Sequence, residues 1–195
     1  MIGFDVNWIR GLGRVIAIND SYQLAPHADV LYSSDFPWWR RSRIQVQHSW
    51  FGQYIVLMND GAWVGEGVRS LRQGPDRGLS HDPKTLCNGK NSGYAAINLA
   101  YLFGAARIYL LGYDMRVTNN RIHWHGNDHA SPVEYQRRCD KLWLPLFDTL
   151  VGPLKTAGVE VRNVNPESAL HCWPKIALRD AVIECRRDMF PVLQA

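Results

Sequence analysis

Three histidines, His123, His125 and His129, lie within seven residues of one another, between a predicted strand and a predicted helix. Histidine is the side chain that titrates near neutral pH without help. A neutral imidazole can accept the proton of a hydroxyl group as its oxygen becomes a nucleophile, which contributes about 10²- to 10⁴-fold to a rate. His129 is the foremost candidate for such a base, because it lies just before the helix, whose positive end favours a neutral imidazole.

The same segment contains side chains that bind metals. The His-x-His pair His123 and His125, together with Asp114 or Asp128, is an acceptable ligand set. No other residues of the sequence have the spacing of metal ligands. Histidines in loops also often form hydrogen bonds with backbone groups instead of binding a metal. Acid–base catalysis, a metal site and a structural role stay open as interpretations. The working interpretation is acid–base catalysis by His129 or His125, beside Asp114 and without a metal.

A second group consists of small amide and hydroxyl side chains at predicted strand ends or at a helix start. Such groups suit a ribose, a base edge or a phosphate at a helix N-terminus. Any one of these residues is weak evidence for a binding site, because polar residues are common at strand ends. The prediction therefore depends on their convergence at one edge of the sheet. The group comprises Asn19, Ser33, Ser34, Asn91, Ser92 and Asn165.

The element that positions these residues is half of a parallel βαβ unit between Asn88 and Asp114. The sequence predicts a helix over 92–103 with Ser92 as N-cap and Gly104 as the left-handed terminating residue. A strand over 107–111 follows, and its unbroken apolar run predicts burial on both faces. Because ligands of open α/β sheets bind beyond the carboxyl ends of strands, Asp114 is expected to border a crevice.

The remaining pattern repeats strand and helix. Strands are predicted over 15–18, 29–35, 54–58 and 159–164, and helices from about 36, 131 and 178. The helix at 131 has a Ser-Pro-x-Glu capping box, with Pro145 as a predicted kink. Trp38 and Trp39 are interpreted mainly as packing residues, with a stacking platform as the alternative. The predicted fold is α/β, a single Rossmann-like domain over 1–195 with a mostly parallel sheet flanked by helices.

Between Gly61 and Asn91 the sequence has many glycines and no helical or alternating period. Unstructured connections of this length are usually functional lids or binding loops, or else flexible insertions, and both interpretations stay open. Its cationic side chains would suit an anion such as a phosphate. They are Arg69, Arg72, Arg77 and Lys90.

Bulk properties limit the functional classes. The chain has 195 residues, is 46% hydrophobic and carries a net charge of +4, which fits one domain and does not imply nucleic acid. The triplet Arg40, Arg41 and Arg43 is interpreted as a solvated helix face rather than a contact to an anionic surface. The four cysteines form no Cys-x-x-Cys pair. Without an apolar leader or a membrane span, the expected location is the cytoplasm, with reduced thiols.

Several motifs together resemble the bacterial sialyltransferase-like superfamily. This group includes lipooligosaccharide sialyltransferases, motility-associated flagellin glycosylation proteins and archaeal-type hydroxymethylpterin diphosphokinases. The sequence looks closest to small phage and prophage members, over most of its length. The motifs are Asn91-Ser92-Gly93-Tyr94, the run from Gly104 to Asp114, His129, Val15 to Asp20, Ala28 to Tyr32, and His123-Trp124-His125-Gly126.

The resemblance implies a nucleotide-binding fold that transfers a sugar without a metal. It places nucleotide contacts at Ser92 in the Asn91-Ser92-Gly93 turn and at Asn19, and it matches the general base to His129 better than to His125. A family tyrosine that holds the leaving phosphate is replaced by Arg116, and a cation can do this work. An upstream arginine is replaced by Gly89 beside Lys90.

The family's first strand and glycine loop have no counterpart here. This departure implies that the reading frame begins further upstream or that catalysis has been lost. The expected activity is transfer of a sugar from a nucleotide-sugar donor to an acceptor hydroxyl, with acceptor and oligomeric state left open. One alternative is diphosphate transfer from ATP with Mg²⁺, near Asp114 or Asp128, to a pterin-like alcohol. The other is a catalytically inactive nucleotide-binding module.

Overall fold

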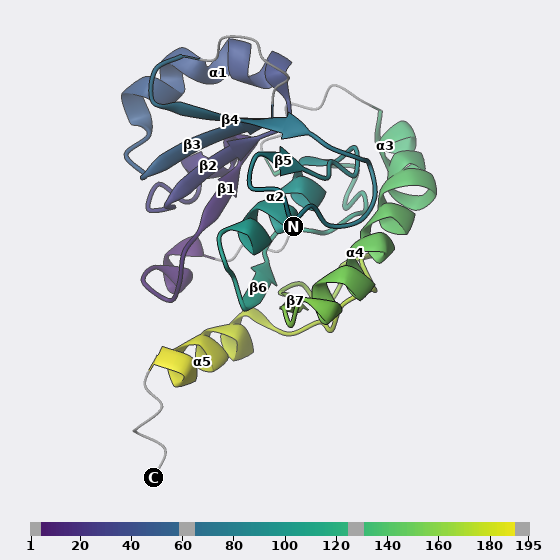
Figure 1. The fold of residues 1–195 in the computed structure, drawn as a ribbon. Coiled ribbons are helices and arrows are strands. Elements are labelled where there is room, and N and C mark those ends of the chain that lie inside the picture. Colours follow the sequence, from purple (N-terminus) through teal and green to yellow (C-terminus); the bar gives the residue numbers. More distant parts are fainter. Residues whose placement is uncertain (1–4, 59–64, 125–130, 190–195) are drawn as a thin grey trace. The chain divides into compact units, whose positions relative to one another are not determined.

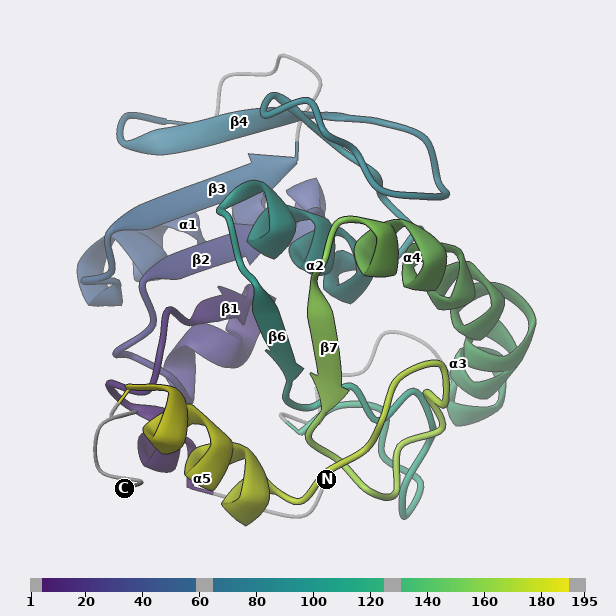
Figure 2. The ribbon, with the colours of Figure 1, turned by 60° about the horizontal axis from the view of Figure 1, so that its bottom comes forward.

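The structure is a computed structural model that describes residues 5–58, 65–124 and 131–189. The contacts within the chain divide it into two compact units. Val6–Gly104 form the N-terminal unit, and Ala105–Ala195, with Met1–Asp5, form the C-terminal unit. Each unit contains parallel strands and helices (Figures 1 and 2). The predicted α/β class with a parallel sheet flanked by helices is therefore confirmed.

The N-terminal unit contains a parallel sheet whose strands follow one another in chain order. Its strands are β1 (Ile16–Ile18), β2 (Val30–Ser33), β3 (Tyr54–Met58), β4 (Val68–Gln73) and β5 (Thr85–Leu86). Its helices are the 3₁₀ turns η1 (Val6–Ile9) and η2 (Asn19–Gln23), and the α-helices α1 (Phe36–Ser49) and α2 (Ser92–Leu102). Because all neighbouring strands run parallel, their carboxyl ends share one edge.

Each face of this sheet is covered by one long helix. On one face, Trp38, Trp39 and Val46 of α1 pack with Leu31 of β2 and Leu57 of β3. The opposite face packs against α2, where alternate strand residues meet small helix residues. These are Val30, Tyr32, Val56 and Met58 on the strands and Ala95, Ala96 and Leu99 on α2. Strand β2 is buried along its whole length, as a central parallel strand should be.

Helix α1 begins where its sequence indicates. The Asp35 carboxylate accepts a hydrogen bond from the Trp38 backbone N–H, and Pro37 lies in the first turn, where a missing N–H costs nothing. Trp38 and Trp39 are both buried in the core. The packing interpretation of the tryptophan pair is thus confirmed.

The C-terminal unit contains a parallel pair of strands and four helical segments in its described part. The strands are β6 (Arg107–Leu110) and β7 (Glu160–Asn163). The helices are α3 (Pro132–Arg138), the π-helix η3 (Cys139–Trp143), α4 (Leu144–Thr156) and α5 (Leu178–Met189). Segments α3, η3 and α4 follow one another without a break (Figure 1).

The helical run after Ser131 contains a π-helical turn just before Pro145, and the kink expected there stays a prediction. The Ser131 hydroxyl accepts a hydrogen bond from Glu134 N–H, which confirms the predicted cap. One π-helical turn precedes Pro145, which lies in the first turn of α4. Because proline lacks an N–H and crowds the carbonyl four residues earlier, a wider turn accommodates it without breaking the run. The run ends at Thr156, before Gly158 in the left-handed region.

Two strand predictions need correction. In β6, Ile108 and Leu110 are buried whereas Arg107 and Tyr109 are half-exposed, so the strand alternates instead of being buried on both faces. The segment 61–91 contains β4 and β5, although its sequence shows no period of two. Strand β4 is mostly exposed, so polar side chains are tolerated on both of its faces and the alternation disappears.

Candidate functional site

Polar side chains gather at the carboxyl edge of the N-terminal sheet. Register pairs Ile18 of β1 with Tyr32 of β2, so the residues that follow them, Asn19 and Ser33, come at the same edge. Ser33 is the last residue of β2 and still pairs with Leu57 of β3. Immediately beyond, the hydroxyl oxygens of Ser34 and Ser92 lie 2.6 Å apart, which joins the end of β2 to the first residue of α2. The structure therefore brings together most of the predicted hydroxyl and amide group.

The start of α2 is capped differently from the sequence prediction. Asn91 is the N-cap, and its side-chain oxygen accepts hydrogen bonds from the backbone N–H groups of Gly93 (2.8 Å) and Tyr94 (3.3 Å). The predicted cap, Ser92, is instead the first helical residue. This exchange leaves the Ser92 hydroxyl free to bond Ser34 and directs it away from its own helix.

Ser33 has a structural task inside the turn that leads into α1. Its hydroxyl accepts a hydrogen bond from Asp35 N–H at 3.0 Å, and its side chain is buried. Asp35 in turn caps α1. Ser33 thus holds the turn that presents Ser34, and a direct contact from Ser33 to a ligand stays a prediction.

Asn19 combines two unusual features. Its backbone lies in the left-handed region, with a φ of 49°, which asparagine tolerates better than most residues. Its side-chain oxygen is buried and has no hydrogen-bond partner among the described residues. An unsatisfied buried acceptor costs about 1–3 kcal/mol, and such costs persist where a group serves a purpose other than stability.

The connection that precedes α2 is fixed to that helix. Asn98, fully buried on α2, accepts hydrogen bonds from the backbone N–H groups of Ser80 and Cys87, both at 2.9 Å, and donates one to the Ser80 carbonyl at 3.0 Å. The Tyr94 hydroxyl donates to the Gly78 carbonyl at 2.9 Å. These bonds hold residues 78–87 in one arrangement.

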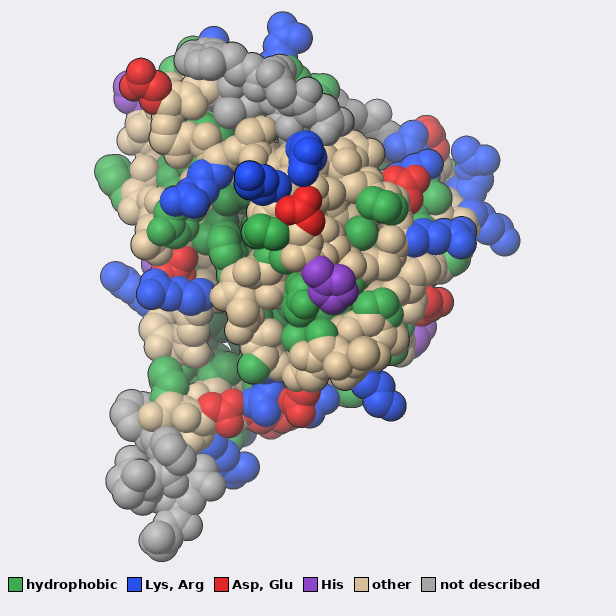
Figure 3. Space-filling view, viewed as in Figure 1, with side chains coloured by type: hydrophobic (Ala, Val, Ile, Leu, Met, Phe, Trp, Pro, Cys, Tyr) green, Lys and Arg blue, Asp and Glu red, His purple; other side chains and the backbone are tan. Residues whose placement is uncertain are grey.

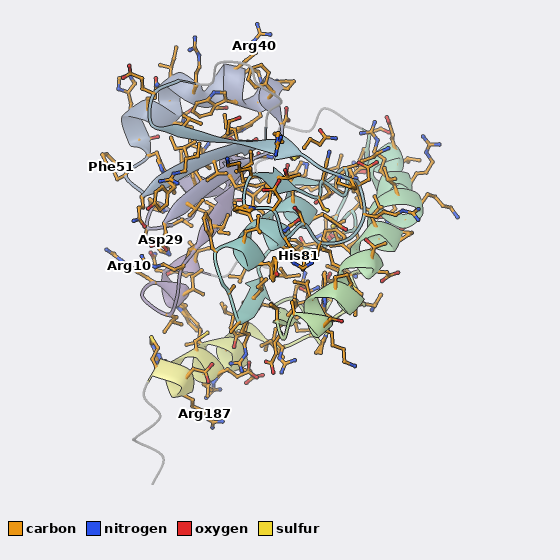
Figure 4. All side chains as sticks on the ribbon, viewed as in Figure 1. Arg10, Asp29, Arg40, Phe51, His81 and Arg187 are labelled. Carbon is orange, nitrogen blue, oxygen red and sulfur yellow. The ribbon has the colours of Figure 1, made fainter. Side chains whose placement is uncertain are left out.

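Two further contacts act on the same connection. A side chain at Gly89 would collide with the Tyr94 ring, so only glycine allows this close approach. On the outer surface, His81 Nδ1 lies 2.7 Å from the Tyr101 hydroxyl (Figure 4).

Sequence reasoning missed the role of Asn98, although a single amide within an otherwise apolar helix was a usable signal. The described part of 61–91 is thus an anchored connection, and its function as a lid stays a prediction.

Most cations of this segment already have partners. Arg72 pairs with Asp82 at 3.3 Å, and Lys90 pairs with Asp76 at the same distance. The guanidinium of Arg69 lies over the Tyr54 ring, 4.6 Å from its centre. An anion bound here would therefore compete with existing carboxylates, which weakens the predicted role of these residues.

In the C-terminal unit, Asp114 and Asn165 connect the turns that follow β6 and β7. The Asn165 amide donates to the Asp114 carboxylate at 2.5 Å, and Ala169 N–H donates to the Asp114 carbonyl at 2.8 Å. The buried Ser168 hydroxyl donates to the Tyr113 carbonyl. Asn165 thus belongs to a cluster in this unit, and its convergence with Asn19 and Ser92 stays a prediction.

Arg116, the residue expected to hold a leaving phosphate, is paired with Glu167 at 2.9 Å. Its side chain is exposed, so the pair is solvated and exchangeable at modest cost. Sequence reasoning missed Glu167, Ser168 and Ala169, because their role depends on a contact between two turns about 50 residues apart in the chain.

His125, His129 and Asp128 lie outside the described residues, so their catalytic and metal-binding roles stay predictions. His123 is exposed, and its ring contacts Tyr135 of α3 edge to face, with centroids 5.4 Å apart. Within the described residues, no group of three His, Cys, Asp or Glu side chains is arranged to hold a metal ion.

The cysteines are not activated nucleophiles. Burial raises the pKa of the Cys139 thiol to about 11 and that of Cys172 to about 12. Burial also raises the pKa values of Cys87 and Cys185. Because the thiolate is the reactive form, these side chains are predominantly protonated and unreactive at neutral pH.

Among the described helices, none is both long and apolar enough to span a bilayer. No protein-family model, curated protein or solved structure matches the chain.

Proposed function

We propose that the chain binds a nucleotide sugar at the carboxyl edge of the N-terminal sheet and transfers the sugar to an acceptor hydroxyl. The observation that carries the proposal is the 2.6 Å contact between the Ser34 and Ser92 hydroxyls. It combines a strand end with a helix N-terminus, which is the usual arrangement for phosphate binding in open α/β sheets.

Each side chain at this edge has a task in donor binding. One of the Ser34 and Ser92 hydroxyls donates to the other, and the O–H that remains can donate to a phosphate oxygen. The positive end of α2 favours negative charge there. The N–H groups of Gly93 and Tyr94 are already bound to Asn91, so hydroxyl groups contribute most of the hydrogen bonds. The Asn19 amide lies at the next strand end and is assigned to the ribose or base.

The transfer step uses the histidine before α3. His129 takes the proton of the acceptor hydroxyl, with His125 as the alternative base, and the hydroxyl oxygen bonds to the anomeric carbon. The bond between that carbon and the phosphate oxygen breaks, and the nucleoside phosphate leaves with the electron pair. Asp114 is assigned to orienting the base.

A thermal-shift titration with CMP-, UDP- and GDP-sugars tests donor binding. Stabilisation by one class without metal is expected, with a loss of about ten- to a hundredfold in affinity for Ser92→Ala, the amount of one charge-assisted hydrogen bond. Ser49→Ala is the matched control, because Ser49 ends α1 at the opposite edge of the sheet and its hydroxyl donates to the Gln45 carbonyl of its own helix. Equal losses in both variants would contradict the site.

Donor consumption tests the chemistry separately. His129→Ala is expected to retain donor binding and lose turnover, whereas His48→Ala, an exposed histidine of α1, should keep both. Stabilisation by ATP only in the presence of Mg²⁺ would indicate diphosphate transfer instead. Donor binding with no consumption in the unmodified chain would indicate a binding module.

A further inference from the structure

The exposed surface of α1 carries three arginines. Arg40, Arg41 and Arg43 are exposed, and within the described residues none of them forms an ion pair. No acidic residue occurs on α1 itself. Figure 4 shows Arg40 pointing away from the ribbon, and blue side chains project over α1 in Figure 3. The helix therefore presents a concentrated positive charge to its surroundings.

Exposed apolar side chains lie on α1 and in the turn that follows it. Positions spaced by three or four residues share one face of a helix, which places Arg40, Arg43, Ile44 and Gln47 in one stripe, beside the buried Trp39 and Val46. Ile44 is 63% exposed. Phe51, one residue beyond the C-cap, is 86% exposed. The surface that these residues form is called the α1 stripe below.

The turn after α1 holds Phe51 outward. Trp50 packs against the core, and any side chain at Gly52 would collide with the Trp50 ring and the Ala28 carbonyl oxygen. Gln53 N–H and Tyr54 N–H both donate to the Asp29 carbonyl, which fixes the other side of the turn. With its neighbours on both sides held against the sheet, Phe51 points to solvent, as Figure 4 shows.

We propose that the α1 stripe binds the surface of an anionic phospholipid bilayer. Arginines flanking exposed aliphatic and aromatic side chains are typical of helices that lie at a membrane interface, where cations contact headgroups and apolar groups enter the acyl boundary. Nucleic acid would engage the arginines but offers Ile44 little, because its accessible backbone is polar. The contact is peripheral, and no part of it requires the proposed transfer activity.

Electrostatics sets the expected strength. A cation near an anionic membrane surface gains roughly a fivefold increase in binding. Replacing Arg40 and Arg43 together should weaken vesicle binding by about 25-fold, and Phe51→Ser should weaken it further by lowering the apolar contribution. Raising the salt concentration should also weaken binding, because the Debye length falls below about 10 Å.

Co-sedimentation of the full chain tests the proposal, with phosphatidylcholine vesicles that contain or lack phosphatidylglycerol. Binding is expected only with phosphatidylglycerol and should weaken for Arg40→Gln with Arg43→Gln and for Phe51→Ser. The matched control is Arg186→Gln with Arg187→Gln, which removes the same charge from exposed positions of α5 (Figure 4). Melting temperatures should stay unchanged in every variant, because the replaced side chains are exposed.

Three results would overturn the proposal. One is absence of binding to the phosphatidylglycerol vesicles, and a second is an equal loss in the α5 control, which would show a response to net charge alone. The third is tighter binding to a duplex oligonucleotide than to vesicles, unaffected by Phe51→Ser, which would assign the stripe to nucleic acid.

Discussion

The hydroxyl oxygens of Ser34 and Ser92 lie 2.6 Å apart, although the residues are 58 positions apart in the chain. This contact joins the end of β2 to the first turn of α2. It also places two linked hydroxyls, one of which keeps a free O–H, where a parallel sheet normally binds its ligand. The coupling between the two hydroxyls is therefore measurable both without ligand and with it.

A double-mutant cycle on Ser34→Ala and Ser92→Ala should show a coupling of about 0.5–1.5 kcal/mol in the free energy of unfolding, the net contribution of one hydrogen bond. In donor binding, the two single variants should each lose affinity and the double variant should lose less than their sum. Urea unfolding and titration calorimetry measure the two quantities. Strict additivity in both would show that the hydroxyls act independently.

Asn98→Ala should lower the free energy of unfolding by about 3 kcal/mol or more. The change leaves the buried N–H groups of Ser80 and Cys87 without an acceptor, and each unsatisfied group costs about 1–3 kcal/mol. Urea unfolding measures the loss, and hydrogen exchange at these two amides locates it. Gln47→Ala, on the exposed face of α1, is the control and should change stability by less than about 0.5 kcal/mol.

Asp29 should make stability depend on pH. Burial acts to raise its pKa, but hydrogen bonds from Val15 N–H and the Arg14 guanidinium outweigh burial and hold the pKa below its ordinary value of 3.8. Because the folded-state pKa is depressed, the stabilisation is complete above about pH 4 and is lost as the pH falls through the folded-state value.

The variant that tests this dependence is Asp29→Asn. It should cost about 1 kcal/mol at neutral pH, where the ionised carboxylate holds β1 beside β2, and progressively less in acid. The residue lies at the surface near the start of β2 (Figure 4). A destabilisation of the same size at every pH would show that packing, not charge, accounts for the effect.

Arg107 should hold α5 in place. Its guanidinium binds Glu160 of β7 at 2.8 Å and also pairs with Asp188 of α5, while the Tyr109 hydroxyl donates to Glu184 at 2.9 Å. Arg107→Ala should therefore reduce hydrogen-exchange protection of α5 amides by roughly fivefold, corresponding to about 1 kcal/mol for a partly solvated pair.

Arg162→Ala is the control for this prediction, since Arg162 reaches Glu160 only at 3.6 Å and, within the part of the chain that the structure describes, forms no ion pair with α5. Protection in α5 should also decrease as salt rises, because partly exposed ion pairs are screened. Unchanged protection in Arg107→Ala would mean that packing of Ala181 and Val182, the buried residues of α5, is sufficient to hold this helix in place.

Local signals in the sequence were sufficient for most elements. Helix α1 begins where its early proline predicted, and α3 where its serine cap predicted, because both signals act within a few residues of the helix start. The strand at Tyr54–Met58 and the helix beginning at Leu178 also agree with the predicted ranges. Each of these elements depends on residues close to it in the chain, so the local sequence is sufficient to predict it.

Distant contacts explain the corrections. Asn91 and Ser92 are both competent caps, and Ser34, far away in the chain, engages the serine hydroxyl, which leaves the cap to asparagine. Strand β4 has no alternating pattern because its exposure on both faces removes the selection for one. The anchoring of residues 78–87 depends on Asn98, whose partners come from a different segment.

For the candidate site, the sequence likewise predicted the local features but not the contacts between distant segments. Its residue types and their places at strand ends were encoded locally, since small polar side chains satisfy the backbone where a strand stops. Their grouping was not, because register between β1 and β2 places Asn19 beside Ser33, and the docking of α2 on the sheet brings Ser92 to Ser34. Hydrogen bonds between segments are specified by three-dimensional packing, which no local stretch of sequence contains.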